Sequence, residues 1–274
     1  MTKIAQVSQF LNQFAPTRLA EEWDNVGLLV GDPKLVVERM MTCLTVTPES
    51  AAEAISQQAN LIISHHPIPF RPLKRITTET VASKLIWDLI RAGVSIYSPH
   101  TGFDSAVSGI NQSLSQRLGI VDATPIKPIL DDPEQLGSGR IGKLASAKPL
   151  GNFIDQIKSD FELQTVRAVG TAEHSVSKVA VACGSGGSFL AAAIRAGCDT
   201  FVTGEATFHT ALEAKANRVA MVLLATIQAN ALRWNHWQRH WPVNSPTPRS
   251  GLAKTNRTRS VGSNDVVFAR TSNA

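Results

Sequence analysis

The sequence has little that points to a membrane or to secretion. Its longest apolar runs, such as residues 219–225, fall far short of the ~20 residues that a transmembrane helix needs. Residues 1–16 lack the continuous apolar stretch of a signal peptide, and their apolar side chains recur at helical spacing instead. Only three cysteines occur, Cys43, Cys183 and Cys198, and three cannot all pair. We therefore expect free thiols in a reducing cytoplasm.

The sequence also lacks a basic domain, although its net charge is +5. Residues 225–274 hold seven of the 27 Lys and Arg residues but only one of the 22 Asp and Glu residues. The part before residue 225 therefore carries 20 basic and 21 acidic side chains. A nearly neutral domain is not expected to bind nucleic acid or a membrane surface. The apolar fraction of the whole sequence, 43%, is typical of a globular protein with a proper core.

Strand-like and helix-like segments alternate regularly up to residue 224. Apolar runs at residues 39–47, 60–66 and 93–100 are predicted strands, and helical patterns lie between them. The second half repeats the pattern, with strands "KVAVACG", "CDTFVTGE" and "RVAMVLL" separated by helices "SFLAAAIRAG" and "ATFHTALEAKA". This order predicts an α/β fold with mainly parallel sheets and right-handed crossovers.

The two halves resemble each other, which predicts two related α/β lobes. A central strand ends in polar residues in each half, "SHH" in the first and "GE" in the second. Because open α/β sheets bind ligands at the carboxyl ends of their strands, we expect a metal site in the cleft between the lobes. The predicted lobes are residues 1–125 and 126–224, connected through the segment 121–148, which contains several Pro and Gly residues. Residues 225–274 are predicted to form an aberrant, poorly ordered tail.

The stretch "IISHHPIPF" is the strongest candidate for metal chemistry. A buried strand is predicted to deliver His65 and His66 at its end, where Pro67 stops it. Adjacent side chains of a strand point to opposite sides, so the pair suits two metals better than one unless the strand has already turned. The next strand is followed by His100 and Asp104 at the equivalent edge. Imidazole and carboxylate ligands together suit Zn²⁺, Mn²⁺ or Fe²⁺, whereas the alternative is a polar loop after a strand.

Two further motifs lie in the second half, and each has two interpretations. If a helix begins at residue 205, Glu205 and His209 share one helical face, as metal ligands or acid/base pairs do. The alternative is an acidic residue at a helix N-terminus with His209 on the surface. The turn "CGSGGS" (183–188) follows a strand and opens a helix, so its amides suit an anion. Tight packing of that turn is the alternative.

Taken together, the motifs resemble those of the dinuclear-metal proteins known as GTP cyclohydrolase I type 2 homologues. The matching stretches extend from residue 1 to about residue 224 and are "EEWDNVGLLVGDP", "IISHHPIPFRPLKRIT", "YSPHTGFD", "VAVACGSGGS" and "FVTGEATFH". The resemblance implies two α/β lobes, a site for two divalent metals (Zn, Fe, Mn or Mg) and a homo-oligomer, usually a toroidal hexamer. By motif it implies that His65, His66 and Asp104 are metal ligands. It also implies that His100, Glu205 and His209 line the same cleft as candidate catalytic residues.

The chain departs from that family after its last predicted strand. The family there has Gly-His and then a Glu four residues after the His, both metal ligands, whereas this chain has Ala225, Thr226 and Asn230. None of these side chains replaces an imidazole or a carboxylate. Codons for residues 225–235, read in a shifted frame, can give Gly-His-Tyr-Ser-Ser-Glu, which favours a frame shift after about residue 224. The alternative is a genuine basic, Trp-rich tail for nucleic acid or membranes.

Two classes of function are consistent with these features. The first is a metal-dependent hydrolase that acts on a nucleotide-like or phosphorylated small molecule. The second is a metal-binding scaffold or interaction protein without turnover. In either case the loss of two ligands predicts that the second metal site is incomplete in this chain.

Overall fold

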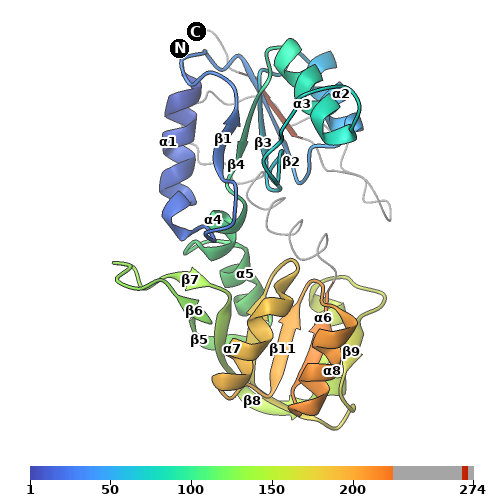
Figure 1. The fold of residues 1–274 in the computed structure, drawn as a ribbon. Helices are drawn as coiled ribbons and strands as arrows, with labels where there is room; N and C mark the ends of the chain where they lie inside the picture. The colour runs from blue at the N-terminus through green and yellow to red at the C-terminus, as the bar shows by residue number, and fades with distance from the viewer. Residues whose placement is uncertain (225–266, 271–274) are drawn as a thin grey trace. The chain divides into compact units, whose positions relative to one another are not determined.

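The computed structural model describes residues 1–224 and the backbone of residues 267–270 (Figure 1). The chain divides into two compact units between Phe103 and Asp104. The predicted boundary at residue 125 lies later in the sequence. The strand Ile120–Thr124 explains the difference, since it pairs with Arg140–Pro149 and therefore belongs to the second sheet. Among the residues that the structure describes, none of the helices is long and apolar enough to cross a membrane.

The first unit is built on a five-stranded mixed sheet of order β1-β4-β3-β2-β13. Its central strands β2, β3 and β4 are parallel, as the alternation of elements predicts, whereas β1 and β13 pair antiparallel at the edges. The elements of this unit are α1 (Ile4–Phe14), η1 (Thr17–Leu19), β1 (Gly27–Val30), β2 (Arg39–Cys43), α2 (Pro48–Ser56), β3 (Leu61–Ser64), α3 (Val81–Arg91), β4 (Ser95–Ser98) and β13 (Val267–Arg270). Helix α4 (His100–Ser105) crosses the division between the units.

Local sequence explains where the crossover helices of the first unit begin. Thr47 caps α2 by accepting a hydrogen bond from the Ser50 amide, and Pro48 occupies the first helical position. Thr80 caps α3 in the same way through the Ser83 amide, so this helix begins at Val81. Figure 1 shows α2 and α3 on one face of the sheet and α1 on the other. The first unit therefore has the layered architecture expected of an α/β protein.

The second unit contains a six-stranded mixed sheet of order β5-β8-β10-β11-β12-β9. Strands β10, β11 and β12 are parallel, and the remaining pairs are antiparallel. Apolar side chains of these strands pack against α7 and α8 in one buried cluster. The elements are α5 (Ile110–Arg117), β5 (Ile120–Thr124), β6 (Lys127–Pro128), β7 (Gly137–Ser138), β8 (Arg140–Pro149), α6 (Leu150–Asp160), β9 (Arg167–Val169), β10 (Ser175–Ala182), η2 (Gly186–Phe189), α7 (Leu190–Arg195), β11 (Thr200–Thr203), α8 (Phe208–Ala216) and β12 (Ala220–Leu223).

The segment 121–148 is more regular than the sequence predicts. It was expected to be a connection, but it contains most of β5, all of β6 and β7, and most of β8. Strands β6 and β7 have only two residues each, and β8 exposes several of its side chains. Short edge strands with polar side chains carry a weak periodic signal, which explains the error.

A buried arginine organises the beginning of the second unit. Arg140 is 2% exposed, and its guanidinium donates to the carbonyls of Gly137 and Gly139 at 2.8 and 2.7 Å. It also donates to the Gln112 side chain at 2.8 Å and to the Ser105 carbonyl at 3.2 Å. Burial lowers the pKa of Arg140, but arginine remains charged in proteins. The hydrogen bonds to oxygen atoms offset the loss of hydration of this buried cation.

The predicted tail, residues 225–274, lies outside the described residues except for β13. The backbone of β13 pairs antiparallel with β2, from Val267 opposite Thr42 to Arg270 opposite Arg39. This pairing of four residues does not test the order of the rest of the tail, which stays a prediction. The edge of a sheet presents unpaired backbone groups, which accept a further strand with little demand on its sequence.

Candidate metal centre

The carboxyl ends of β3 and β4 place three histidines of the first unit together. His65 and His66 directly follow β3, and His100 follows β4 as the first residue of α4. Their ligand nitrogens all lie within 4.8 Å of one another. Two nitrogens bound to one tetrahedral zinc ion at 2.0–2.1 Å lie about 3.4 Å apart, so the rings need to approach one another by no more than about 1.4 Å to share an ion. The residues therefore fit a divalent metal.

Backbone hydrogen bonds explain why His65 and His66 do not diverge as neighbours on a strand would. Strand β3 ends at Ser64, and the amides of His65 and His66 donate to the carbonyls of Cys43 and Leu44 at 3.2 and 2.9 Å. The Ser98 hydroxyl donates to the His65 carbonyl at 2.6 Å. The two imidazole centroids lie 5.0 Å apart as a result. The chain has therefore already turned at His65, and the two side chains do not point to opposite sides of the sheet as they would on a continuing strand.

Asp24 holds the third histidine from behind. The Nδ1 atom of His100 lies 2.8 and 2.9 Å from the two carboxylate oxygens of Asp24. The amide of Thr101 donates to the same carboxylate at 3.1 Å, and its hydroxyl donates there as well. When Nδ1 carries the proton for Asp24, the lone pair of Nε2 is left for a metal. A carboxylate behind a ligating histidine is a recurrent feature of metal sites.

The backbone at His100 is itself unusual. Its φ angle is 27°, in the left-handed region that residues other than glycine rarely adopt. Such a conformation costs of order 1–3 kcal/mol and persists only where its surroundings enforce it. The hydrogen bonds that Asp24 makes to both His100 and Thr101 provide that constraint.

The electrostatic environment keeps two of the three imidazoles, those of His65 and His66, neutral. Burial and, to a smaller extent, the charge of the nearby His100 lower the pKa of His66 to about 4. His65 is fully buried, and burial followed by the charges of His66 and His100 holds its pKa well below the usual value. Neutral imidazole is the form that binds metals, so no proton has to be displaced from these two rings at neutral pH.

The acid behind the cluster remains ionised. Burial alone would raise the pKa of Asp24, but hydrogen bonds from His100 and Thr101 and the charge of His100 lower it below its usual value. The Thr45 hydroxyl lies 2.6 Å from Nδ1 of His66 and occupies the corresponding place behind that ring. Two of the three imidazoles therefore have a polar partner on the side away from the cluster.

Asp104, predicted as a metal ligand with His65 and His66, lies one helical turn beyond His100 in α4. It is the first residue of the second unit, so its position relative to the histidines stays a prediction. Within that unit, the Asn111 side chain donates to the Asp104 carbonyl at 3.1 Å. Asn111 also accepts from the Cys183 amide at 2.8 Å. Burial, together with the charge and hydrogen bond of Asp104, raises the pKa of the Cys183 thiol well above its usual value.

Glu205 and His209 are not paired on one helical face. Helix α8 begins at Phe208, because Thr207 caps it by accepting from the Thr210 amide at 3.2 Å. Glu205 precedes the helix, where its amide donates to the Gly184 carbonyl at 2.9 Å. Both Glu205 and His209 are exposed. Their assignment as candidate catalytic residues stays a prediction that rests on the resemblance.

The turn "CGSGGS" owes one of its glycines to packing. A Cβ atom on Gly186 would lie 2.6 Å from the Thr203 hydroxyl and 2.8 Å from the Ala182 methyl group. The Gly186 amide donates to the same hydroxyl at 3.1 Å. This close approach between β10, β11 and η2 favours the packing interpretation over an anion site.

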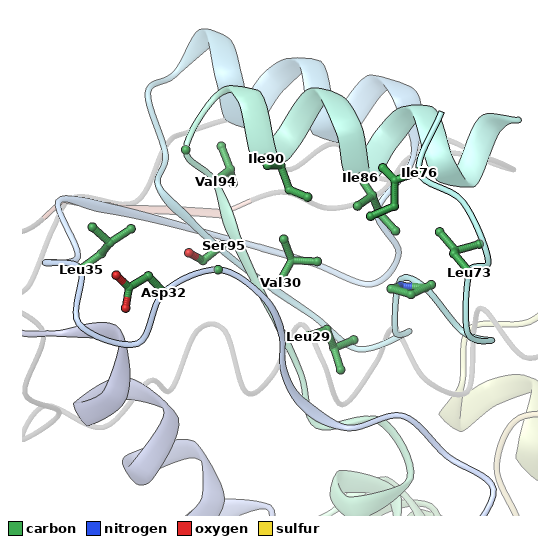
Figure 2. A pocket seen from close by; sticks show the side chains of 13 residues that line it. Leu29, Val30, Asp32, Leu35, Leu73, Ile76, Ile86, Ile90, Val94 and Ser95 are labelled. Atoms are coloured by element: carbon green, nitrogen blue, oxygen red, sulfur yellow. The ribbon is translucent and has the colours of Figure 1, made fainter. Parts of the chain in front are cut away.

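A second hollow in the first unit is chemically different from the histidine cluster. Figure 2 shows a pocket between β1, α3 and the loop before α3. Its volume is about 560 Å³. Its lining is mostly aliphatic, including Leu29, Val30, Ile86 and Ile90, and Figure 2 shows the oxygen atoms of Asp32 and Ser95 on one side. No imidazole lines this pocket, which offers surface for apolar contact and lacks the nitrogen ligands of the cluster.

Three residues of the site were not singled out from sequence as site residues. Asp24 and Thr45 lie behind imidazoles, and Thr101 hydrogen-bonds Asp24. Asp24 does fall in "EEWDNVGLLVGDP", one of the stretches that carry the family resemblance. The position of Asp24 in this motif was the only sequence signal for its role, because its partner His100 lies far away in the sequence.

The fold and site together define a two-unit mixed α/β protein with a three-histidine cluster that fits a metal. The chain belongs to the Duf34/NIF3 (NGG1p interacting factor 3) family, whose model matches residues 2–227. It is 32% identical over 220 residues to a "GTP cyclohydrolase 1 type 2 homolog" of Clostridium acetobutylicum, covering 80% of this chain and 82% of the relative. It is 33% identical over 225 residues to "NIF3-like protein 1" of Drosophila melanogaster, covering 81% of this chain and 75% of that protein.

Solved structures share the fold. A Bacillus cereus protein related to NIF3 matches with a TM-score of 0.76 at 22% identity, covering 94% of this chain and 99% of that one. A Staphylococcus aureus protein matches with a TM-score of 0.75 at 25% identity, with the same two coverages. The family predicted from the motifs is thereby confirmed, and so is the mixed α/β fold.

Proposed function

We propose that this chain binds a divalent metal ion through His65, His66 and His100. The observation that carries the proposal is the group of three ligand nitrogens within 4.8 Å of one another. Their environment supports it, because burial keeps the imidazoles of His65 and His66 in the neutral, metal-binding form.

The donor set narrows the class of metal. Imidazole nitrogen suits Zn²⁺ and Fe²⁺, and Mn²⁺ becomes more favourable when carboxylates join the set. Asp104 is proposed as such a carboxylate ligand, on the basis of the resemblance and of its place four residues after His100. Because Ala225, Thr226 and Asn230 supply neither imidazole nor carboxylate, we propose that this chain holds one metal rather than two.

The proposed activity is hydrolysis of a nucleotide-like or phosphorylated small molecule. A bound divalent metal supplies a water of lowered pKa and a Lewis acid. In this chain Asp24 holds the His100 ring by its Nδ1 atom, and Thr45 holds the His66 ring in the same way. The name of the Clostridium acetobutylicum relative supports a nucleotide-like substrate.

The proposed setting is an assembly of several copies of the chain in a reducing compartment such as the cytoplasm. The family resemblance supports a homo-oligomer, and a toroidal hexamer is the specific expectation. Three free cysteines, of which Cys43 and Cys198 are buried, support a reducing compartment. Light scattering of the purified chain measures the assembly directly, and a monomer at micromolar concentration would contradict this part of the proposal.

Metal titration tests the binding proposal. Isothermal titration of the metal-free chain with Zn²⁺ should give one binding event, and His65→Ala should abolish it. His174→Gln is the matched control, because His174 bonds the Asp199 carbonyl in the second unit and retains a donor as glutamine. Equal affinities for the chain as given and for His65→Ala would overturn the proposed site.

Turnover separates a hydrolase from a metal-binding scaffold. The Zn²⁺-loaded chain is incubated with nucleoside triphosphates, nucleoside monophosphates and simple phosphate esters, and product is followed by chromatography. Product that depends on His65 supports hydrolysis. Tight, His65-dependent metal binding without product from any of these substrates would instead assign the chain to the scaffold class.

A further inference from the structure

Two exposed aromatic rings stand beside the histidine cluster of the first unit. Trp23 is 61% exposed and Phe70 is 48% exposed, and their ring centroids lie 5.9 Å apart. Both rings meet the imidazole of His100 edge to face, at centroid distances of 6.3 and 6.2 Å. The aromatic pair is therefore continuous with His100, one of the three histidines of the cluster.

Hydrogen bonds hold the two loops that carry these rings. Asn25, two residues after Trp23, donates from its side chain to the carbonyl of Pro69 at 2.8 Å. The amide of Asn25 donates to Asp24, which also holds His100. The same short stretch thus fixes the imidazole on one side and Trp23 on the other.

Core packing does not explain this arrangement. More than half of Trp23 and about half of Phe70 remain in contact with solvent, although burial of such rings is what stabilises a fold. Single exposed apolar residues are common and need no explanation. Two that touch each other and also touch a candidate metal ligand form a ready surface for stacking.

The loop that follows Phe70 is basic, whereas the acidic residues Glu21, Glu22 and Asp24 flank Trp23. Arg71, Lys74 and Arg75 follow Phe70 closely and are all exposed. Residues 70–78 contain no acidic side chain. A ligand whose ring lies on Trp23 and Phe70 would therefore find positive charge for an anionic substituent at the adjacent loop.

We propose that Trp23 and Phe70 form a recognition subsite for a planar aromatic ring that carries an anionic group, placed directly beside the histidine cluster. The subsite narrows the substrate class of the proposed function. Its role in catalysis rests on that proposed function. Binding of the ring itself depends only on the aromatic pair and the basic loop. The metal and the ring are therefore tested separately.

The test uses the full chain, first free of metal and then loaded with Zn²⁺, and measures affinity by isothermal titration. The probes are guanosine 5′-monophosphate, which has a planar ring, and ribose 5-phosphate, which has the same anionic group without the ring. We expect the ring-bearing probe to bind at least tenfold more tightly. Trp23→Ala should weaken it by roughly 5- to 150-fold, the usual range for loss of one aromatic–base contact.

The control variants separate recognition from folding. Trp23→Phe should retain most of the affinity, and Trp87→Ala removes an equally large ring, 41% exposed on α3, without effect on either probe. Trp23→Ala should leave the affinity for Zn²⁺ and for ribose 5-phosphate unchanged. Failure of Zn²⁺ to bind would count against the proposed function alone, since the probes are also measured without metal.

Several outcomes would overturn the subsite. They are equal binding of the two probes, no binding of guanosine 5′-monophosphate at millimolar concentration, and equal losses for Trp23→Ala and Trp87→Ala. A fall in Zn²⁺ affinity on Trp23→Ala would assign the ring a structural role at His100 instead. A change in the molecular mass of the assembly on Trp23→Ala would show that a second copy covers the ring, which also contradicts the proposal.

Discussion

Both units place polar residues at the carboxyl ends of parallel strands, but the burial and the hydrogen-bond partners of these residues differ between the units. In the first unit, His65 is fully buried and His66 and His100 have polar partners behind their rings. In the second unit, Glu205 and His209 follow β11 and are exposed. A similar strand-turn-helix pattern therefore produces an organised cluster in one unit and surface residues in the other.

The difference shows that strand ends alone do not make a site. The first unit adds Asp24 from a distant loop, and Ser98 fixes the His65 carbonyl. In the second unit the corresponding turn is occupied by close packing of Gly186 on Thr203. Hydrogen bonds that hold the histidines in place, more than their position at a sheet edge, distinguish the candidate metal centre.

Arg140 provides the largest expected effect and tests what holds the second unit together. Arg140→Leu leaves the Gly137, Gly139 and Ser105 carbonyls without their buried donor. We expect the free energy of unfolding to fall by about 3–5 kcal/mol, measured by denaturant titration. Arg195→Leu, at an exposed position of α7, should change it by less than about 0.5 kcal/mol. Similar effects of the two variants would show that the buried network is dispensable.

Asp24 tests whether support behind the ring is what matters in the first unit. Asp24→Asn removes the charge that orients His100, and we expect Zn²⁺ affinity to fall by about 10- to 100-fold. Glu22→Gln, the same acid-to-amide change at an exposed neighbour, should leave the affinity within twofold. The comparison between the units loses its basis if both variants bind Zn²⁺ as tightly as the chain as given.

A buried thiol in each unit makes the free energy of unfolding depend on pH. Burial raises the pKa of Cys43 in the first unit to about 12 and that of Cys198 in the second to about 11, from a usual value near 9. The folded pKa is raised, so the stability from each protonated thiol is present below pH 9 and is lost as pH rises toward the folded pKa. Between pH 9 and 10.5 the expected slope is up to about 1.4 kcal/mol per pH unit for each thiol.

Denaturant titrations at several pH values measure this slope. Cys43→Ala should flatten the alkaline loss of stability, because its unfolded state no longer gains a thiolate. Tyr97, whose pKa burial raises to about 12, continues to titrate above pH 10, so the comparison is made below that value. An unchanged slope in Cys43→Ala between pH 9 and 10 would contradict burial of this thiol.

The exposed pair of the second unit should have the smallest effect. Glu205→Gln and His209→Ala are expected to change Zn²⁺ affinity by less than twofold, because the proposed ligand nitrogens lie in the first unit. Any role of these residues in turnover would appear in product formation and not in the titration. A tenfold loss of Zn²⁺ affinity in either variant would move the metal centre away from the three-histidine cluster.

Much of the fold was predictable because its central strands are short apolar runs with helices between them. The parallel strands β2, β3 and β4 and their counterparts β10, β11 and β12 match the predicted segments. The edges were not predictable to the same degree. Strands β6 and β7 consist of two residues each, and no periodicity can be read from two residues.

The candidate site was likewise predictable only in part. His65, His66 and His100 could be identified because strand ends gather at one edge of a parallel sheet. Asp24 could not, since it contacts a residue 76 positions later through tertiary structure alone. The start of α8 at Phe208 depended on whether Thr207 would act as the cap, which separated Glu205 from the helix.

Metal content after dialysis tests the central claim most directly. The chain as given and a His65→Ala variant are loaded with Zn²⁺, dialysed against metal-free buffer and analysed by mass spectrometry. We predict at most one weakly held ion per chain, absent from His65→Ala, because Thr226 and Asn230 cannot complete a second site. Two tightly retained ions per chain, or one that survives His65→Ala, would contradict a metal centre built on the three histidines of the first unit.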